Sequence, residues 1–410
     1  MLARWLGPAA LAAAVLGVLG CGGASPSTST EAIGNQLAIY SSLPLQGPSA
    51  AISQQLVNGE KLALSQAGGH VGPFKIGYAS LDDSDPKSGL STPAITSTNA
   101  KTAAQDTSTI AYLGDYGSAA TAVSLPLINA AGILQVSPGS PYVGLTSSLD
   151  AGQDEPGRFY LSGHRNFGRL QPGDVTQAAA QAQLMKSLGV RRVYVLDNQD
   201  PFEEPLARIT GTRAEEAGVK VLARDSIATA AEATYTGEVE KILESHADAV
   251  FFAGGGGPGT VALWLALHRA APHLVLLGTS SMLGEEFTSQ IGSAQASTYL
   301  TSPVLPTSMY PASAQRVLGE YRRAFGAIPN AYALYGYEAM SVVLSAIRRA
   351  GPRGNDRQTV IDRFLATHER DSVLGRYSIQ PDGETTLSRY AVDRVVGGRT
   401  VFYRAFDLAP

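Results

Sequence analysis

Short runs of β-branched and aromatic residues alternate with longer amphipathic stretches from residue 37 onward, and this alternation constrains the fold more than any other feature. The short runs predict strands at 37–40, 74–79, 110–113, 133–136, 193–196, 219–223, 249–253 and 274–277. The stretches between them predict helices at 50–67, 86–105, 118–131, 172–188, 203–217, 235–245 and 259–271. Strands that alternate with helices of this length form parallel sheets with helices on both faces.

These units are too numerous for one comfortable sheet, so we predict an α/β fold with two doubly wound parallel-sheet lobes. The length of 410 residues agrees with two or three domains. A loop-like segment near 144–165, rich in glycine and proline, marks the expected division. Residues 311–366 read as wholly helical, and residues 373–406 read as short strands.

The N-terminal residues 1–20 have the charged and apolar regions of a secretory signal peptide. They end in Val18-Leu19-Gly20-Cys21, which resembles the lipobox of bacterial lipoproteins, and Cys21 is the only cysteine of the chain. We therefore expect lipidation of Cys21, with residues 21–36 as a flexible tether to the outer face of the cell membrane. The alternative is an uncleaved membrane anchor with an incidental cysteine.

Composition and motifs argue against several classes of protein. One cysteine forms no internal disulfide and builds no structural zinc site, and 31 Lys+Arg against 35 Asp+Glu give no general attraction to nucleic acid. Gly254, Gly256 and Gly259 formally satisfy a dinucleotide fingerprint, but the next strand does not end near an acid for the ribose. We predict no enzyme, no cofactor and no metal site.

Ligands of open parallel sheets bind beyond the carboxyl ends of the strands. Ser118 follows one such strand and is suited to capping the next helix, whose first amides would favour a carboxylate. Gly139 follows the next strand and allows a close approach of the backbone to a ligand. A serine that only caps its own helix, and an ordinary Pro/Gly turn at 137–141, are the simpler alternatives.

Several segments, taken in order, resemble the leucine/isoleucine/valine-binding proteins, type I periplasmic binding proteins that serve ABC importers. The matching segments are Leu43–Pro48 with Asn58-Gly59, Asp82-Asp83 with Asp85-Pro86, Ser118–Thr121 with Pro126, and Ala131–Ile133 with Ser137-Pro138. The resemblance covers residues 37–406. It implies two lobes, 37–158 plus 304–388 and 159–303 plus 389–406, joined by three hinge strands that cross near 159–162, 298–303 and 388–390.

The same resemblance implies a ligand pocket in the cleft between the lobes. Three departures from the family stand out: Pro141 replaces a threonine, Ser280 replaces the glutamate that pairs with the ligand's ammonium, and a tyrosine is lost near Gly255. The positions carried over are Ser118, Ala119, Ala120, Gly139, Ser140, Pro141, Phe202, Gly255, Gly256 and Ser280.

Ser280 provides no counter-charge for an ammonium that loses its water in a closed cleft. Asp115, Asp197, Asp200 or Glu285 could replace the missing glutamate. From the sequence we therefore expect an amino acid or, in preference, a small carboxylate with an apolar or aromatic body.

The expected function is that of an extracytoplasmic solute-binding lipoprotein of an ABC importer. Its partners would be a small-molecule ligand, a permease in the membrane, and the membrane itself through the lipid on Cys21. We expect a monomer that binds no nucleic acid. Two alternatives stay open: a sensor lipoprotein that signals to a receptor or kinase, and a lipoprotein that no longer binds a small molecule.

Overall fold

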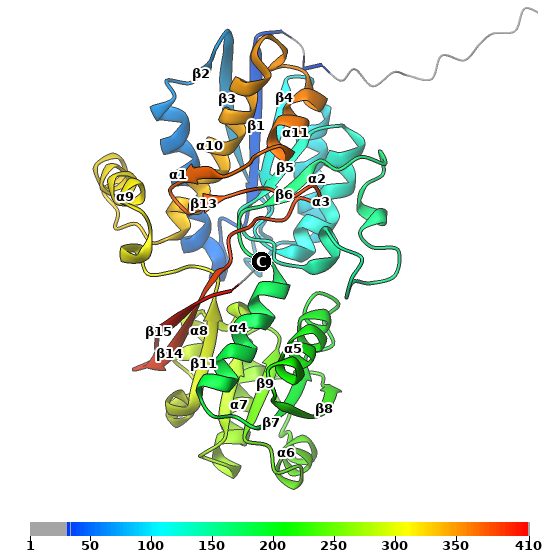
Figure 1. Cartoon of the computed structure of the whole chain (residues 1–410), viewed down its shortest axis with the longest axis vertical. Coiled ribbons are helices and arrows are strands. Elements are labelled where there is room, and N and C mark those ends of the chain that lie inside the picture. The colour runs from blue at the N-terminus through cyan, green and yellow to red at the C-terminus, as the bar shows by residue number, and fades with distance from the viewer. Residues whose placement is uncertain (1–30, 33, 409–410) are drawn as a thin grey trace, which may run out of the picture.

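Two sheets, each flanked by helices, lie one above the other along the long axis of the molecule (Figure 1). The structure is a computed structural model that describes residues 31, 32 and 34–408. Three segments of the described chain pass from one lobe to the other, so each lobe is assembled from parts distant in sequence.

The first lobe contains a sheet with the strand order β2-β3-β1-β4-β5-β6, parallel except for the short edge strand β2. Its strands are β1 (Gln36–Leu43), β2 (His70–Val71), β3 (Phe74–Asp82), β4 (Thr109–Gly114), β5 (Leu134–Ser137) and β6 (Phe167–Arg169). Its helices are α1 (Ala50–Gln66), α2 (Pro93–Gln105), α3 (Ser118–Ala130), α9 (Ala312–Phe325), α10 (Tyr332–Ala350) and α11 (Arg357–Leu365).

The second lobe contains a sheet with the order β15-β14-β11-β10-β9-β7-β8, in which β14 and β15 are antiparallel to their neighbours. Its strands are β7 (Arg192–Asp197), β8 (Lys220–Ser226), β9 (Ala249–Ala253), β10 (Val275–Gly278), β11 (Thr298–Ser302), β14 (Arg389–Val396) and β15 (Arg399–Asp407). Its helices are α4 (Asp174–Ser187), α5 (Glu204–Glu216), α6 (Thr236–Glu244), α7 (Pro258–Ala270) and α8 (Glu285–Thr288). A separate hairpin joins β12 (Arg370–Ser372) to β13 (Gly375–Tyr377).

One large apolar core lies mainly in the first lobe and another in the second, as expected for sheets covered on both faces, and a third cluster joins buried residues of both lobes, among them Tyr142 and Leu206. In the first lobe, α1 packs directly on α10 where Gly59 faces Ala333. A Cβ on Gly59 would lie 2.2 Å from the carbonyl oxygen of Ala333, so only glycine permits this approach. In the second lobe, Trp264 is fully buried between Phe252 and Phe287 in edge-to-face contacts.

The predicted α/β fold with two parallel-sheet lobes is confirmed, with three local corrections. The helix expected from residue 86 begins at Pro93, because Asp85 accepts the amides of Lys87 and Ser88 and holds a turn there. The region 311–366 contains α9, α10 and α11, separated by breaks that include Gly326 in the left-handed conformation.

The third correction concerns the first crossing, which was expected near 159–162. Strand β6 at Phe167–Arg169 still pairs with β5, so the chain leaves the first sheet only after Arg169. The detailed lobe boundaries otherwise stay a prediction.

In the described part of the chain, no helix combines the length and apolar character needed to span a bilayer.

Candidate ligand-binding site

A cavity of about 390 Å³ lies between the two lobes, where loops at the carboxyl ends of both sets of parallel strands meet. Residues after β4 and β5 form its first-lobe wall: Tyr116, Gly117, Ser118, Ala119, Gly139 and Pro141. Residues after β7, β9 and β10 form most of its second-lobe wall: Asn198, Asp200, Phe202, Glu203, Leu206, Gly255, Ser280 and Ser281. Five further residues complete the cavity. Gln171 and Pro303 come from segments that cross between the lobes, Asp174 and Gln177 from α4, and Tyr332 from α10.

The first-lobe wall presents the beginning of helix α3. Gly117 is the N-cap residue, so the expectation that Ser118 caps this helix is wrong. Ser118 is the first helical residue, and its Oγ accepts the Tyr142 amide at 3.2 Å. The first helical hydrogen bond runs from the Thr121 amide to the Gly117 carbonyl at 3.0 Å. The amides that precede it have no partner within the helix and carry the positive end of its dipole.

Aromatic side chains provide the apolar surface of the cavity. Tyr116 meets Tyr332 edge to face, with ring centroids 6.1 Å apart. Phe202 from the second lobe meets Tyr142 from the first at 5.0 Å and an interplanar angle of 82°. This second pair brings the two lobes together at the rim of the cavity.

The second-lobe wall is acidic. Asp174, Asp200 and Glu203 line the cavity, and the described lining includes no lysine, arginine or histidine. Glu203 accepts a hydrogen bond from Ser281 Oγ at 2.7 Å, and its burial raises its pKa to about 7. Burial, followed by the neighbouring charge of Glu203, raises the pKa of Asp174 well above its usual value. Together these groups favour a cationic part of a ligand over an anionic part.

Comparison with known proteins identifies the fold and the family. Residues 41–399 match the family model described as periplasmic binding protein. The chain belongs to this family. This confirms the expected resemblance to the leucine/isoleucine/valine-binding type, a group of solute-binding proteins rather than enzymes.

Two relatives illustrate the similarity in sequence. An amino acid binding protein of Pseudomonas aeruginosa is 24% identical over 354 residues, which cover 85% of this chain and 87% of that protein. Leu/Ile/Val-binding protein homolog 1 of Brucella abortus is 24% identical over 356 residues, covering 85% and 88% of the two chains.

Two solved structures share the fold at lower identity. The leucine binding protein of Thermotoga maritima has a TM-score of 0.73 at 20% identity, covering 91% of this chain and 99% of that one. A solute binding protein of R. palustris in complex with benzoate has a TM-score of 0.70 at 16% identity, covering 92% and 97%.

Within this periplasmic binding protein, seven of the expected pocket positions line the cavity, and three do not. Those in the lining are Ser118, Ala119, Gly139, Pro141, Phe202, Gly255 and Ser280. Ser140 is buried behind the wall, where its Oγ donates to the Asp115 carbonyl at 3.0 Å. Ala120 is buried on α3, and Gly256 packs against Phe287, where a Cβ would lie 2.7 Å from the phenylalanine Cβ.

Of the four candidate counter-charges, only Asp200 lines the cavity. Asp115 is fully buried behind it, where it accepts hydrogen bonds from Tyr112 and Ser124. Asp197 is engaged by Ser226 Oγ at 2.7 Å and by a turn amide. Glu285 is 75% exposed beside Arg399.

Glu203 and Asp174 line the cavity, although the sequence pattern does not point to either of them. Both lie at or next to the start of a predicted helix, at 203–217 and 172–188, where the pattern predicts ordinary helical positions. The signal available was the position of Glu203 directly after Phe202, a residue already assigned to the pocket. Ser280 lines the cavity at the position expected for the family's glutamate, and its Oγ donates to Gln177 Oε1 at 3.0 Å.

The glycine run at 254–259 has a packing role in this structure. Gly257 is the N-cap of α7, and Thr260 Oγ1 donates to the Gly255 carbonyl at 2.7 Å. A Cβ on Gly259 would lie 2.7 Å from the backbone of Thr229. Among the residues that the structure describes, no group of three or more His, Cys, Asp or Glu is arranged to hold a metal ion.

Proposed function

We propose that this protein is the extracytoplasmic solute-binding component of an ABC importer and closes its two lobes over a small ligand. The observation that carries the proposal is the cavity between the lobes, with the helix α3 amides on one wall and carboxylates on the other. Neither wall alone encloses a ligand, so binding favours the closed arrangement. Membership of the periplasmic binding protein family supports this role, and no catalytic step is proposed.

The ligand that fits both walls best is a zwitterionic α-amino acid with an apolar side chain. Its carboxylate would accept hydrogen bonds from the first amides of α3 and from Ser118 Oγ. Its ammonium would pair with Glu203, beside Asp200 and Asp174. The aromatic rings of Phe202 and Tyr116 would contact its side chain.

A small carboxylate with an aromatic body, preferred from the sequence, is the second candidate. That preference rested on the lack of charge at Ser280, and Glu203 removes this reason because it places a carboxylate in the cavity. The candidate keeps support from the neutral first-lobe wall and from the similarly folded protein solved with benzoate.

Calorimetric titration of the chain without residues 1–20 tests this proposal. We expect heat of binding with L-leucine, L-isoleucine, L-valine or L-phenylalanine, and weaker or no binding of benzoate and 4-hydroxybenzoate. Tight binding of benzoate alone would replace the first candidate by the second. Binding of none of these ligands would count against the solute-binding role itself.

The membrane-side part of the proposal rests on Cys21, which lies outside the described residues, and on the expected tether 21–36, of which residues 31, 32 and 34–36 are described. The expected end of the tether is wrong: Ala32 is buried, its amide donates to the Asn355 carbonyl at 2.8 Å, and β1 begins at Gln36. Lipid on Cys21 and a shorter tether at 22–30 would hold the protein, as a monomer, beside a permease on the outer face of the cell membrane. Labelled palmitate should appear on the wild-type chain and be absent from Cys21→Ala. Loss of ligand uptake on deletion would support import, whereas intact uptake with a lost transcriptional response would support the sensor alternative.

A further inference from the structure

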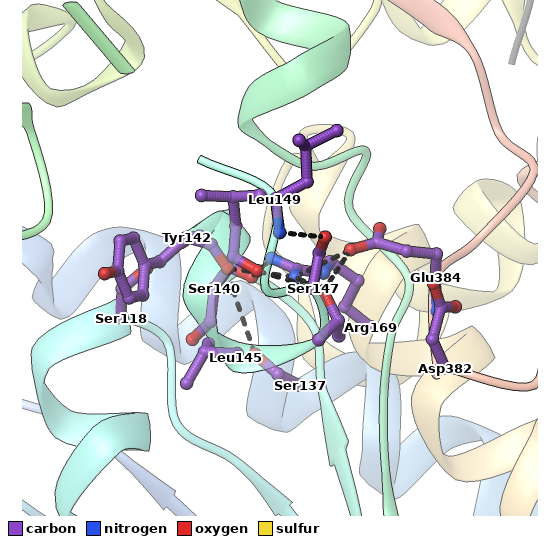
Figure 2. A network of polar contacts seen from close by, with 12 residues as sticks. Ser118, Ser137, Ser140, Tyr142, Leu145, Ser147, Leu149, Arg169, Asp382 and Glu384 are labelled. Atoms are coloured by element: carbon purple, nitrogen blue, oxygen red, sulfur yellow. Dashed lines mark hydrogen bonds and ion pairs between the residues drawn. The ribbon is translucent and has the colours of Figure 1, made fainter. Parts of the chain in front are cut away.

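Residues 140–150, here called the bridging segment, run from the cavity wall to the surface of the second lobe. At its inner end, the segment is held by Arg169 at the end of β6 (Figure 2). Arg169 Nη1 donates to the Ser140 carbonyl at 2.6 Å, and Nη2 donates to the Tyr142 carbonyl at 2.9 Å and to Thr146 Oγ1 at 2.7 Å. This arginine is fully buried, so its charge needs a fixed partner.

Glu384 supplies that partner from the segment between β13 and β14. Its carboxylate lies 2.8 Å from Arg169 Nη2 (Figure 2). The carboxylate also accepts a hydrogen bond from Thr146 Oγ1 at 2.5 Å. The Arg169 amide also donates to the Gly383 carbonyl at 3.0 Å. These contacts fix the inner end of the bridging segment to the first lobe.

At its outer end, the bridging segment contacts α5 of the second lobe. Arg208 forms an ion pair with the Asp150 carboxylate, and its Nη2 donates to the Asp150 carbonyl at 2.8 Å. Both side chains are 37% exposed, and neither residue lines the cavity. Between the two ends, Tyr142 contacts Phe202 of the second lobe. The segment is therefore bound to one lobe at its base and to the other lobe at its tip.

We propose that Arg208 and Asp150 form a latch that stabilises the closed lobes and so increases ligand affinity without touching the ligand. The inference rests on the proposed function, in which the lobes separate to release ligand. Because Arg169 and Glu384 keep the bridging segment on the first lobe, opening must break the contact between Arg208 and Asp150. A contact made only in the closed state shifts the population toward that state and slows ligand release.

Three variants and one control test the latch. Asp150→Asn removes the negative charge and keeps the backbone carbonyl that Arg208 contacts. Asn also tolerates the left-handed conformation of residue 150, whose φ is 60°. Arg208→Gln removes the other partner, and the double variant completes the cycle. Arg213→Gln is the matched control, since Arg213 lies on the same helix and pairs only locally with Glu216 at 2.8 Å.

Release of L-leucine, with benzoate as a second probe, should be about two- to fivefold faster in each single variant, as expected for a half-exposed ion pair. The double variant should release ligand no faster than Arg208→Gln alone, because that substitution already removes both contacts with Asp150, and the control should match the wild type. Raising the ionic strength should speed release more in the wild type than in Asp150→Asn. Unchanged release rates, or single effects that add in the double variant, would overturn the latch.

A ligand-free measurement separates this inference from the proposed function. Small-angle X-ray scattering should give a larger radius of gyration for Asp150→Asn than for the wild type, at an unchanged unfolding temperature. If neither probe binds the wild type, the proposed function fails, while equal radii would independently refute the latch. A lowered unfolding temperature with unchanged radius would mean that the pair only stabilises the bridging segment.

Discussion

The two walls of the cavity are built in different ways. The first-lobe wall consists of the backbone at the start of α3 and the glycine turn after β5, and it carries no charged side chain. The second-lobe side carries three acidic side chains, Asp174 from α4 and Asp200 and Glu203 from the loop after β7. In the proposed function, one wall would bind the ligand through main-chain amides, whereas the other would bind it through carboxylates.

This difference separates the general from the specific part of binding. The free amides at the start of a helix can donate hydrogen bonds to any small carboxylate, so the first wall is suited to a broad class of ligands. In the proposed function, the position and protonation of Glu203 and Asp174 would decide whether that carboxylate must also carry an ammonium. Substitutions on the two walls should therefore affect amino acids and simple carboxylates differently.

Glu203→Gln should have the largest effect. It replaces the proposed partner of the ammonium by a neutral amide, so L-leucine affinity should fall by about 10- to 100-fold, the scale of a hydrogen bond to a charged group. The affinity for 4-methylpentanoate, which is leucine without its amine, should stay the same or rise. Calorimetric titration of both ligands measures the contrast.

The matched control is Glu215→Gln, which removes an exposed glutamate that pairs with Arg224 on the outside of the same lobe. It should leave both affinities unchanged. An equal loss of both ligands in Glu203→Gln would contradict the assignment, because it would mean that the carboxylate supports the wall rather than the ammonium.

Ser118→Ala tests the opposite wall. Removing this hydroxyl should weaken L-leucine and 4-methylpentanoate alike, by about 1–2 kcal/mol. The unfolding temperature should change little, because the hydroxyl accepts only a long bond from the Tyr142 amide at 3.2 Å. A loss confined to leucine would reverse the proposed roles of the two walls.

The first wall could be predicted from the sequence much better than the second. Ser118 and Gly139 follow buried strands at positions set by the order of strands and helices, so finding the strands also located the wall. The capping role was misassigned by one residue, because Gly117 adopts the extended N-cap conformation instead of Ser118.

The second wall depends on how separate segments come together. Asp174 lies on a crossing helix, and its amide donates to the Pro141 carbonyl at 2.9 Å, a contact that no local pattern reveals. Glu203 enters the cavity because the loop after β7 turns back, with the Glu203 amide on the Asp200 carbonyl at 3.1 Å. The first crossing between the lobes was also misplaced in the prediction, because β6 has only three residues and no distinctive sequence pattern.

The pH dependence should distinguish the walls next. Burial raises the pKa of Glu203 to about 7, so the carboxylate loses its charge as the pH falls through that value. L-leucine affinity should then fall by about fivefold to tenfold between pH 8 and pH 6, while Glu203→Gln should show a smaller change that leaves only the contribution of Asp174. Titration calorimetry at several pH values records both curves.

Ligand-free stability should change in the opposite direction. A carboxyl whose pKa is higher in the folded than in the unfolded state binds more protons when folded, so stability decreases as the pH rises from about 5 to about 7. Asp174 contributes with the same sign, so the informative quantity is the difference between wild type and Glu203→Gln. Parallel melting curves for the two proteins across this range would contradict the raised pKa.

Phe202→Leu should have the smallest effect, because it changes the contact between the walls rather than either wall's polar groups. Leucine keeps an apolar side chain in the cavity but loses the edge-to-face contact with Tyr142, whose ring lies 5.0 Å away. The affinity for both ligands should fall by about threefold, the size of a typical aromatic pair contribution. Faster ligand release with an unchanged association rate would locate the effect in the closed state, where the two rings meet. A slower association rate would instead mean that Phe202 acts in ligand entry. The closed lobes would then be held together by the polar contacts of Arg208 and Asp150, without a contribution from this ring pair.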